Sequence, residues 1–270
     1  MSRQLKPVES LNLGVAPRID PKRQAEFGQF MTPSSVARFM ASLFPPSNLQ
    51  TCHLLDAGAG WGALTCAFLD RWASEEFGFE SIDSTAYEID DNLRAHLAQN
   101  LARFNRVRSR IIAGDYIEIA TAGGLLDRGY THTILNPPYK KINGRSNHRL
   151  ALRAVGIETV NLYSAFVALA TAETTPGGQI VAIVPRSFCN GPYYRSFRRY
   201  ILEHAAIRHI HLFDSRNKAF KADKVLQENI IIRLERAGQK GPVTVTTSTD
   251  DSFSDLTTNQ PPFDRIVFSD

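Results

Sequence analysis

Strand-like and helix-like segments alternate along most of the chain, and this alternation restricts the fold more than any other feature of the sequence. Segments with helical spacing separate most of seven apolar runs rich in β-branched residues, at 52–56, 84–89, 108–114, 131–136, 178–185, 207–213 and 228–235. The pattern predicts a mostly parallel sheet of seven strands with helices on both faces. Only residues 214–227 separate the last two runs, which is short for a helical crossover, so we expect these strands to form an antiparallel hairpin at the sheet edge.

The length and composition of the chain fit one large globular domain, or one domain with a small appendage. Its 270 residues can bury a sizeable core, and its net charge of +4 permits a polyanionic partner without demonstrating one. No run approaches the ~18 apolar residues of a membrane-spanning helix, and the first residues do not resemble a secretory signal. Three widely spaced cysteines without zinc-ligand spacing indicate a reducing cytoplasm and no metal site.

A glycine-rich loop follows the first predicted strand, in the run LLDAGAGWGALTCAFL at 54–69. Asp56 ends the strand, and Gly58 and Gly60 follow before a segment with helical spacing. Glycines allow the backbone to approach a ligand closely, and the first amides of a helix have no intrahelical partner. The loop is therefore a candidate ligand site, although a bound dinucleotide or a purely structural turn would also explain the glycines.

Acidic residues end the next two predicted strands. Glu88 follows the second strand, where a carboxylate can accept two hydrogen bonds from ribose hydroxyls, whereas the nearby Asp90 has the features of a helix cap. After the third strand, Asp115 can accept from the exocyclic amine of an adenine, and Tyr116 can lie against the ring. Because the carboxyl ends of parallel strands share one edge of the sheet, we expect these residues to form one site. Their order, a glycine-rich loop after an aspartate, then a glutamate, then an aspartate with an aromatic residue, favours S-adenosylmethionine over NAD.

The run GQFMTP at 28–33 precedes a segment with one apolar face. Thr32 has the chemistry of an N-cap and Pro33 that of a first helical residue, so we expect a helix that begins there and packs on the core. Helix capping does not explain why the whole run lies just upstream of the glycine loop.

The fourth predicted strand ends in Asn136-Pro137-Pro138-Tyr139, and these four residues suit the methylation of an exocyclic amine. The lone pair of such an amine is delocalised into its ring, so acceptors that hold both hydrogens make the nitrogen a better nucleophile. The side-chain oxygen of Asn136 and the main-chain carbonyl of Pro137 can be these acceptors, and Tyr139 offers a flat face for an extruded base. The alternative is a sequence that only terminates a strand.

The order of these motifs resembles that of the gamma-class DNA adenine-N6 methyltransferases of restriction–modification systems. The similarity covers roughly residues 28–235 and comprises GQFMTP, DAGAGWG, YEID, GDY, NPPY, NLYSAFVALA and GGQIVAIVP. It implies a class I S-adenosylmethionine-dependent methyltransferase fold, which is α/β and Rossmann-like. It also implies an enzyme that transfers a methyl group from S-adenosylmethionine to N6 of an adenine flipped out of double-stranded DNA, in a restriction–modification or phage-defence system of a prokaryotic cytoplasm.

The resemblance also implies a role for each matching residue. Asn136 and Pro137 orient the target amine, and Tyr139 stacks on the target base. A second aromatic residue of the family meets the flipped base, and the matching region offers Tyr194, with Tyr193 as second choice. The residues assigned to the cofactor are Thr32, Asp56, Gly58, Gly60, Glu88, Asp115, Tyr116 and Asn136.

Two basic stretches flank these residues and are candidates for contacts with DNA phosphates. One follows the NPPY motif as a loop that we expect to be mobile, and the other lies beside Tyr194 on a predicted helix. Basic runs are often only solvated surface, but these interleave with aromatic residues. The candidate phosphate ligands are Lys140, Lys141, Arg195, Arg198 and Arg199.

We expect three parts in the chain: an N-terminal extension at 1–27, a catalytic domain at 28–236, and at 237–270 a polar linker that starts an absent target-recognition region. Within this last part, the run VTVTTS at 243–248 is a candidate for one more strand. The family carries a target-recognition region after its catalytic core. A truncated chain is therefore the favoured interpretation, and a separate specificity or restriction subunit or weak sequence selectivity are the alternatives. The alternative functions are an RNA or protein-glutamine methyltransferase and a non-catalytic DNA-binding subunit of a restriction complex.

Overall fold

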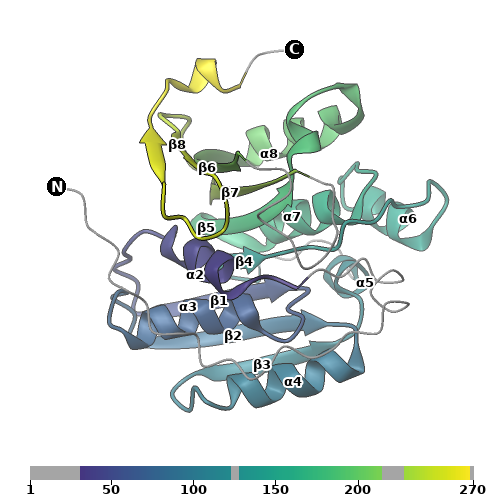
Figure 1. The fold of residues 1–270 in the computed structure, drawn as a ribbon. Coiled ribbons are helices and arrows are strands. Elements are labelled where there is room, and N and C mark those ends of the chain that lie inside the picture. The colour runs from purple at the N-terminus through teal and green to yellow at the C-terminus, as the bar shows by residue number, and fades with distance from the viewer. Residues whose placement is uncertain (1–30, 123–127, 215–227, 268–270) are drawn as a thin grey trace.

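The computed structural model describes residues 31–122, 128–214 and 228–267, and within them nine strands form a single sheet (Figure 1). The strands are β1 (Thr51–Ala57), β2 (Ser81–Glu88), β3 (Arg108–Ala113), β4 (Tyr130–Leu135), β5 (Thr174–Pro185), β6 (Ala205–Phe213), β7 (Asn229–Arg236), β8 (Thr244–Ser248) and β9 (Thr257–Asn259). The helices are α2 (Ser34–Ser42), α3 (Ala63–Ala73), α4 (Asp91–Leu101), α5 (Tyr116–Thr121), α6 (Asn147–Ala154), α7 (Leu162–Glu173) and α8 (Arg195–His204). Short 3₁₀ helices are η1 (Arg186–Cys189), η2 (Pro192–Tyr194) and η3 (Phe263–Arg265).

The strand order is β3-β2-β1-β4-β5-β7-β6-β8-β9, which Figure 1 shows running from β3 at the bottom of the view to the yellow strands at the top. Strands β1 to β5 pair in parallel with their neighbours, and β7 is antiparallel to both β5 and β6. The predicted parallel sheet with an antiparallel pair is therefore confirmed. The order reverses between β1 and β4, which is where open α/β sheets bind ligands.

The side chains of the sheet pack into two hydrophobic cores, one on each face. In β1, Leu54 belongs to the core covered by α2, α3 and α4, whereas its neighbour Leu55 belongs to the core covered by α5, α7 and α8. Residues 180–184 of β5 are fully buried, because helices cover both faces of this central strand. Within the described residues, no helix is both long and apolar enough to cross a membrane.

The prediction of seven strands and a polar linker after Arg236 needs correction. β8 pairs in parallel with β6, and β9 pairs antiparallel with β8, so residues 244–259 extend the sheet. Phe253 also stacks on Phe39 of α2 at 4.1 Å between ring centroids. The sequence of this segment is polar and aperiodic because one short strand lies at the sheet edge, where Thr and Asn side chains remain solvated. The predicted N-terminal extension and residues 28–30 lie outside the described residues.

Two buried histidines join β6 to the added strand β8. His209 Nε2 and His211 Nδ1 lie 2.8 and 2.9 Å from the hydroxyl oxygen of Thr246, so this hydroxyl bridges both rings. Burial lowers the pKa of His209 to about 4 and that of His211 to about 3, so both rings are neutral near pH 7. Among the described residues, no group of three or more His, Cys, Asp or Glu is placed to hold a metal ion.

Candidate cofactor and catalytic site

A cavity of about 420 Å³ opens at the carboxyl ends of β1 to β4. It lies at the predicted edge of the sheet, and a volume of this size is typical of small-molecule sites. The structure brings to its walls six residues expected from the sequence: Gly58, Gly60, Glu88, Asp115, Tyr116 and Asn136.

The glycine loop after β1 turns its backbone toward the cavity. Gly58 and Gly60 have φ angles of +79° and +59°, in the left-handed region that glycine adopts without steric penalty. A Cβ atom on Gly58 would lie 3.5 Å from the ring of Phe166, whereas one on Gly60 would meet no atom within 4 Å. The loop is therefore packed at Gly58 and open to a ligand at Gly60.

Glu88, at the end of β2, fastens the glycine loop to the next strand. Its Oε2 accepts a hydrogen bond of 2.7 Å from the Gly60 amide, and its Oε1 accepts one of 2.8 Å from the Asp90 amide. Burial raises the pKa of Glu88, and the amide hydrogen bonds oppose that rise. Asp90 accepts from the amides of Asn92 and Leu93, which confirms it as the N-cap of α4.

Asp56 lies beneath the glycine loop and not on the cavity wall. The side chain is fully buried, and its Oδ2 accepts a 2.6 Å hydrogen bond from the hydroxyl of Thr65 in α3. Burial raises the pKa of Asp56 to about 7. Because the carboxyl group connects β1 to α3, it fixes the two ends of the loop that it precedes.

Asp115 and Tyr116 follow β3 and also line the cavity. Asp115 caps α5 by accepting from the Glu118 amide at 3.0 Å, and its Oδ2 lies 3.2 Å from His148 Nε2. Burial alone would raise the pKa of Asp115, but the hydrogen bonds from His148 and Glu118 outweigh burial and lower it. The buried hydroxyl of Tyr116 donates to Glu173 Oε2 at 2.7 Å, so this ring is fixed at the base of the cavity.

The hydrogen bonds of Asn136 connect the NPPY motif to the run before the first helix. Its Nδ2 donates to the Thr32 hydroxyl at 3.0 Å, and its Oδ1 accepts from the Tyr139 hydroxyl at 3.1 Å. The prediction of Thr32 as an N-cap is wrong, because Pro33 occupies that position and the Thr32 side chain is turned to Asn136 instead. Pro137 is buried, and Pro138 lines the cavity.

Three tyrosines form a row beside the cavity. Tyr139 lies edge-on to Tyr163 at 6.2 Å between ring centroids, and Tyr163 lies 5.7 Å from Tyr194. The Tyr194 hydroxyl also accepts a hydrogen bond from the side chain of Asn161. Tyr139 and Tyr194 thus pack against a shared neighbour and not against the cavity, and Tyr193 is 54% exposed.

The candidate phosphate ligands divide into two groups. Lys140 and Lys141 line the cavity, whereas Arg195 and Arg199 on α8 are exposed, and Arg198 donates to the carbonyl of Phe188 at 3.0 Å. The stretch after the NPPY motif was expected to be a mobile loop. In the structure it continues into α6, which Ser146 caps by accepting from the Arg149 amide.

Sequence reasoning missed several residues of the cavity wall. Phe166 lies on α7, whose side chains are apolar on every face, so no periodic pattern distinguishes it from core residues. Ile89 lines the cavity and is an exposed isoleucine in the structure, whereas only the acidic residues on either side of it were assigned roles from the sequence. His148 was hidden in a basic run, and Met31 in the GQFMTP run was given no role.

A family model matches residues 61–220, a range that begins just after Gly60 and covers the acid-bearing ends of β2 and β3 and the NPPY motif, and its description is Eco57I restriction-modification methylase. The chain belongs to the Eco57I restriction-modification methylase family. The resemblance inferred from the motifs is thereby confirmed. The match extends through the row of tyrosines and α8, so both proposed base-contacting regions lie within the family's common core.

Individual relatives of this Eco57I-family chain agree with the assignment. It is 49% identical to the Type II methyltransferase M.BsuBI of Bacillus subtilis over 99% of this chain and 55% of that protein. It is 42% identical to the Type II methyltransferase M.PstI of Providencia stuartii over 97% of this chain and 54% of that protein. The chain thus spans about half the length of these curated relatives.

The fold has relatives among solved structures. A Listeria monocytogenes protein described as a class I S-adenosylmethionine-dependent methyltransferase superposes with a TM-score of 0.66 at 16% identity, over 83% of this chain and 68% of that one. Identity this low establishes a shared fold alone. The predicted class I architecture is therefore confirmed, with two further strands at one edge of its sheet.

Proposed function

We propose that this Eco57I-family chain carries the catalytic part of a DNA methyltransferase, which transfers a methyl group from S-adenosylmethionine to N6 of an adenine flipped out of double-stranded DNA. The observation that carries the proposal is the position of Asn136. It lines the same cavity as the glycine loop and the acid-bearing ends of β2 and β3, so an amine held by Asn136 would face a cofactor held by the other walls.

The residues present fit this cofactor. Glu88 and Asp115 are carboxylates that line the cavity, and they suit ribose hydroxyls and an adenine amine, respectively, because a carboxylate oxygen can accept more than one hydrogen bond. Ile89 and Phe166 supply apolar surface for the purine, and Gly60 leaves room for the methionine part. When bound, S-adenosylmethionine supplies an electrophilic methyl group on a positively charged sulfur.

Asn136 is suited to orient the target amine. Its Nδ2 faces the Thr32 hydroxyl and its Oδ1 faces the Tyr139 hydroxyl, so two hydroxyl groups hold the amide in place. The side-chain oxygen of Asn136 is the proposed acceptor for one amine hydrogen, and the main-chain carbonyl of Pro137 is the proposed acceptor for the other. With both hydrogens held, the nitrogen lone pair is directed to the methyl group.

Tyr139 and Tyr194 are the proposed stacking residues for the flipped base. Both rings contact Tyr163, Tyr139 edge-on and Tyr194 tilted, and neither lines the cavity in the structure. Exposed Arg195 and Arg199 beside Tyr194 would bind the DNA backbone. We further propose a prokaryotic cytoplasmic location, a catalytic domain near residues 28–236, and a target-recognition region or a specificity or restriction subunit as partner.

Incubation of the protein with labelled S-adenosylmethionine and either DNA, RNA or protein tests this function. We expect label in N6-methyladenine of double-stranded DNA. Label in RNA or protein alone would instead favour the other planar amine or amide substrates that an Asn-Pro-Pro-Tyr motif can hold. Asn136→Ala should abolish transfer while binding of S-adenosylhomocysteine stays near that of the parent protein; collapse of binding would make Asn136 structural.

A further inference from the structure

The segment between β4 and α7 forms one wall of the cavity. It contains α6 and returns to the sheet beside its own start, because the Ile142 amide donates to the Val160 carbonyl and the Leu162 amide donates to the Lys140 carbonyl, both at 2.8 Å. We call residues 140–161 the insert. Six of its side chains line the cavity: Lys140, Lys141, Ile142, Asn143, Ser146 and His148.

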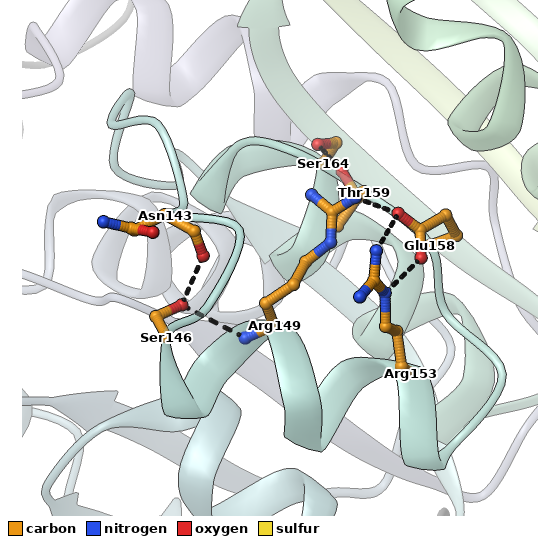
Figure 2. Close-up of polar contacts among 7 residues, drawn as sticks. All are labelled: Asn143, Ser146, Arg149, Arg153, Glu158, Thr159 and Ser164. Atoms are coloured by element: carbon orange, nitrogen blue, oxygen red, sulfur yellow. Dashed lines mark hydrogen bonds and ion pairs between the residues drawn. The ribbon is translucent and has the colours of Figure 1, made fainter.

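Charged contacts within the insert hold α6 against the chain that follows it (Figure 2). Glu158 receives Arg149 and Arg153, which lie one turn apart on α6, and Arg153 Nε is 2.7 Å from Glu158 Oε2. At the other end of the helix, the Ser146 hydroxyl donates to the Asn143 carbonyl and accepts from the Arg149 amide. With both ends fixed, the insert has the construction of one rigid unit.

His148 on α6 connects this unit to α5 on the cavity wall through two carboxylates. His148 Nε2 lies 3.2 Å from Asp115 Oδ2 and 3.8 Å from Glu118 Oε1, both on α5 or at its cap. Lys140 and Lys141 line the same cavity, whereas the arginines of α6 are directed to Glu158. The histidine thus faces two carboxylates, and its side chain is only 27% exposed.

We propose that protonated His148 is a positioning residue that holds the insert closed over the adenine end of the cofactor cavity by pairing with Asp115. The inference rests on the proposed function, in which Asp115 receives the adenine of S-adenosylmethionine. The hydrogen bond with Asp115 raises the pKa of His148 and burial opposes it, so the imidazolium persists to a higher pH than that of a free histidine.

The pair with His148 does not prevent Asp115 from holding a purine amine. Asp115 lines the cavity, and its carboxylate meets the Glu118 amide through Oδ1 and His148 through Oδ2, so a purine amine can share an oxygen with either partner. Cofactor affinity should therefore be highest where His148 is protonated, and it should fall as pH rises through the pKa of His148.

Calorimetric titration of the full chain with S-adenosylhomocysteine between pH 6 and 9 tests this positioning role. We expect His148→Gln to bind about three- to tenfold more weakly than the parent at pH 6 and to lose the fall in affinity that the parent shows at higher pH. His53→Gln is the matched control, because His53 pairs with Asp83 across β1 and β2, 3.7 Å apart and away from the cavity wall. Its affinity and pH profile should equal those of the parent.

The outcomes separate this inference from the proposed function. No binding by the parent protein at any pH would overturn the cofactor assignment itself. Normal binding by the parent, with the same affinity and pH profile in His148→Gln, would overturn the role of His148 alone. Tighter binding by the variant would overturn it too, since His148 would then compete with the ligand for Asp115.

Discussion

The side chain of Asn136 donates a hydrogen bond of 3.0 Å to the hydroxyl of Thr32, a residue 104 positions earlier in the chain. Thr32 is only 7% exposed, so water does not readily replace it as the acceptor. The hydroxyls of Thr32 and Tyr139 hold the Asn136 amide between them, with its oxygen toward Tyr139 and the proposed target amine. The run before α2 therefore belongs to the catalytic machinery as well as to the packing of a helix.

Thr32→Ala should lower the rate of methyl transfer, because the amide of Asn136 would lose one of the two hydroxyls that hold it in place. We expect a loss of roughly tenfold to a hundredfold in the single-turnover rate, with binding of S-adenosylhomocysteine nearly unchanged. Thr32→Ser retains the hydroxyl and should keep most of the activity. Equal losses in both variants would show that the methyl group of Thr32, and not its hydrogen bond, is what matters.

Tyr139→Phe should separate the two proposed roles of this tyrosine. The change removes the hydroxyl that donates to Asn136 Oδ1 but keeps the ring, so the single-turnover rate should fall about fivefold, the equivalent of one hydrogen bond of ~1 kcal/mol. Tyr139→Ala should lose far more, because it also removes the stacking surface. Similar rates for the two variants would contradict a stacking role for the ring.

The sheet, and the edge at which the cavity opens, could be predicted because buried strands and helices leave periodic patterns of apolar residues in the sequence. The β1 run and the capping acid Asp90 are local signals, and the structure confirms both. Thr32 had the same local signal as a cap, but a partner 104 residues away claims its hydroxyl, and no local pattern records such a contact. His148 is similar, since its pairing with Asp115 depends on how α6 meets α5.

The added edge strands show a second limit of sequence reasoning. β9 is exposed along its whole length, so its sequence carries no apolar alternation and reads as a linker. Its pairing depends on β8, which is anchored through Thr246 to two histidines of β6. These hydrogen bonds join residues that lie more than 30 positions apart in the sequence, so no local pattern predicts them.

Gly60→Ala should weaken cofactor binding without disrupting the fold. A methyl group at Gly60 meets no protein atom within 4 Å, so it would occupy space that the proposed cofactor needs, and the φ of +59° adds a strain of about 1 kcal/mol. Gly177→Ala is the control, because Gly177 has a φ of +82°, equally open surroundings and no place on the cavity wall. Both variants should unfold at similar urea concentrations, while only Gly60→Ala should bind S-adenosylhomocysteine more weakly in calorimetry.

His132→Phe should make the protein less sensitive to acid. His132 lies on β4 in a cluster of phenylalanine rings, with Phe79 and Phe44 at 5.0 and 5.5 Å between centroids. A phenylalanine keeps these ring contacts and loses only the hydrogen bond of 2.9 Å between His132 Nδ1 and the Thr131 hydroxyl, a loss that is the same at pH 7 and at pH 5. Burial, with a smaller effect from Arg71, lowers the pKa of His132 from 6.5 to about 4. Below pH 6.5 the unfolded chain therefore takes up a proton that the folded protein does not, and the stability that neutral His132 allows is lost as pH falls toward 4.

Between pH 6.5 and 5 this proton uptake costs about 2 kcal/mol of unfolding free energy, and the variant should be spared that loss. Urea titrations followed by circular dichroism give the unfolding free energy of each protein at pH 7 and at pH 5. The loss between the two pH values in the parent, minus the loss in the variant, measures the contribution of His132. His209 and His211 titrate in the same direction, but they are present in both proteins and cancel from the comparison. If the parent and His132→Phe lost the same stability between the two pH values, His132 would already be solvated or charged in the folded protein.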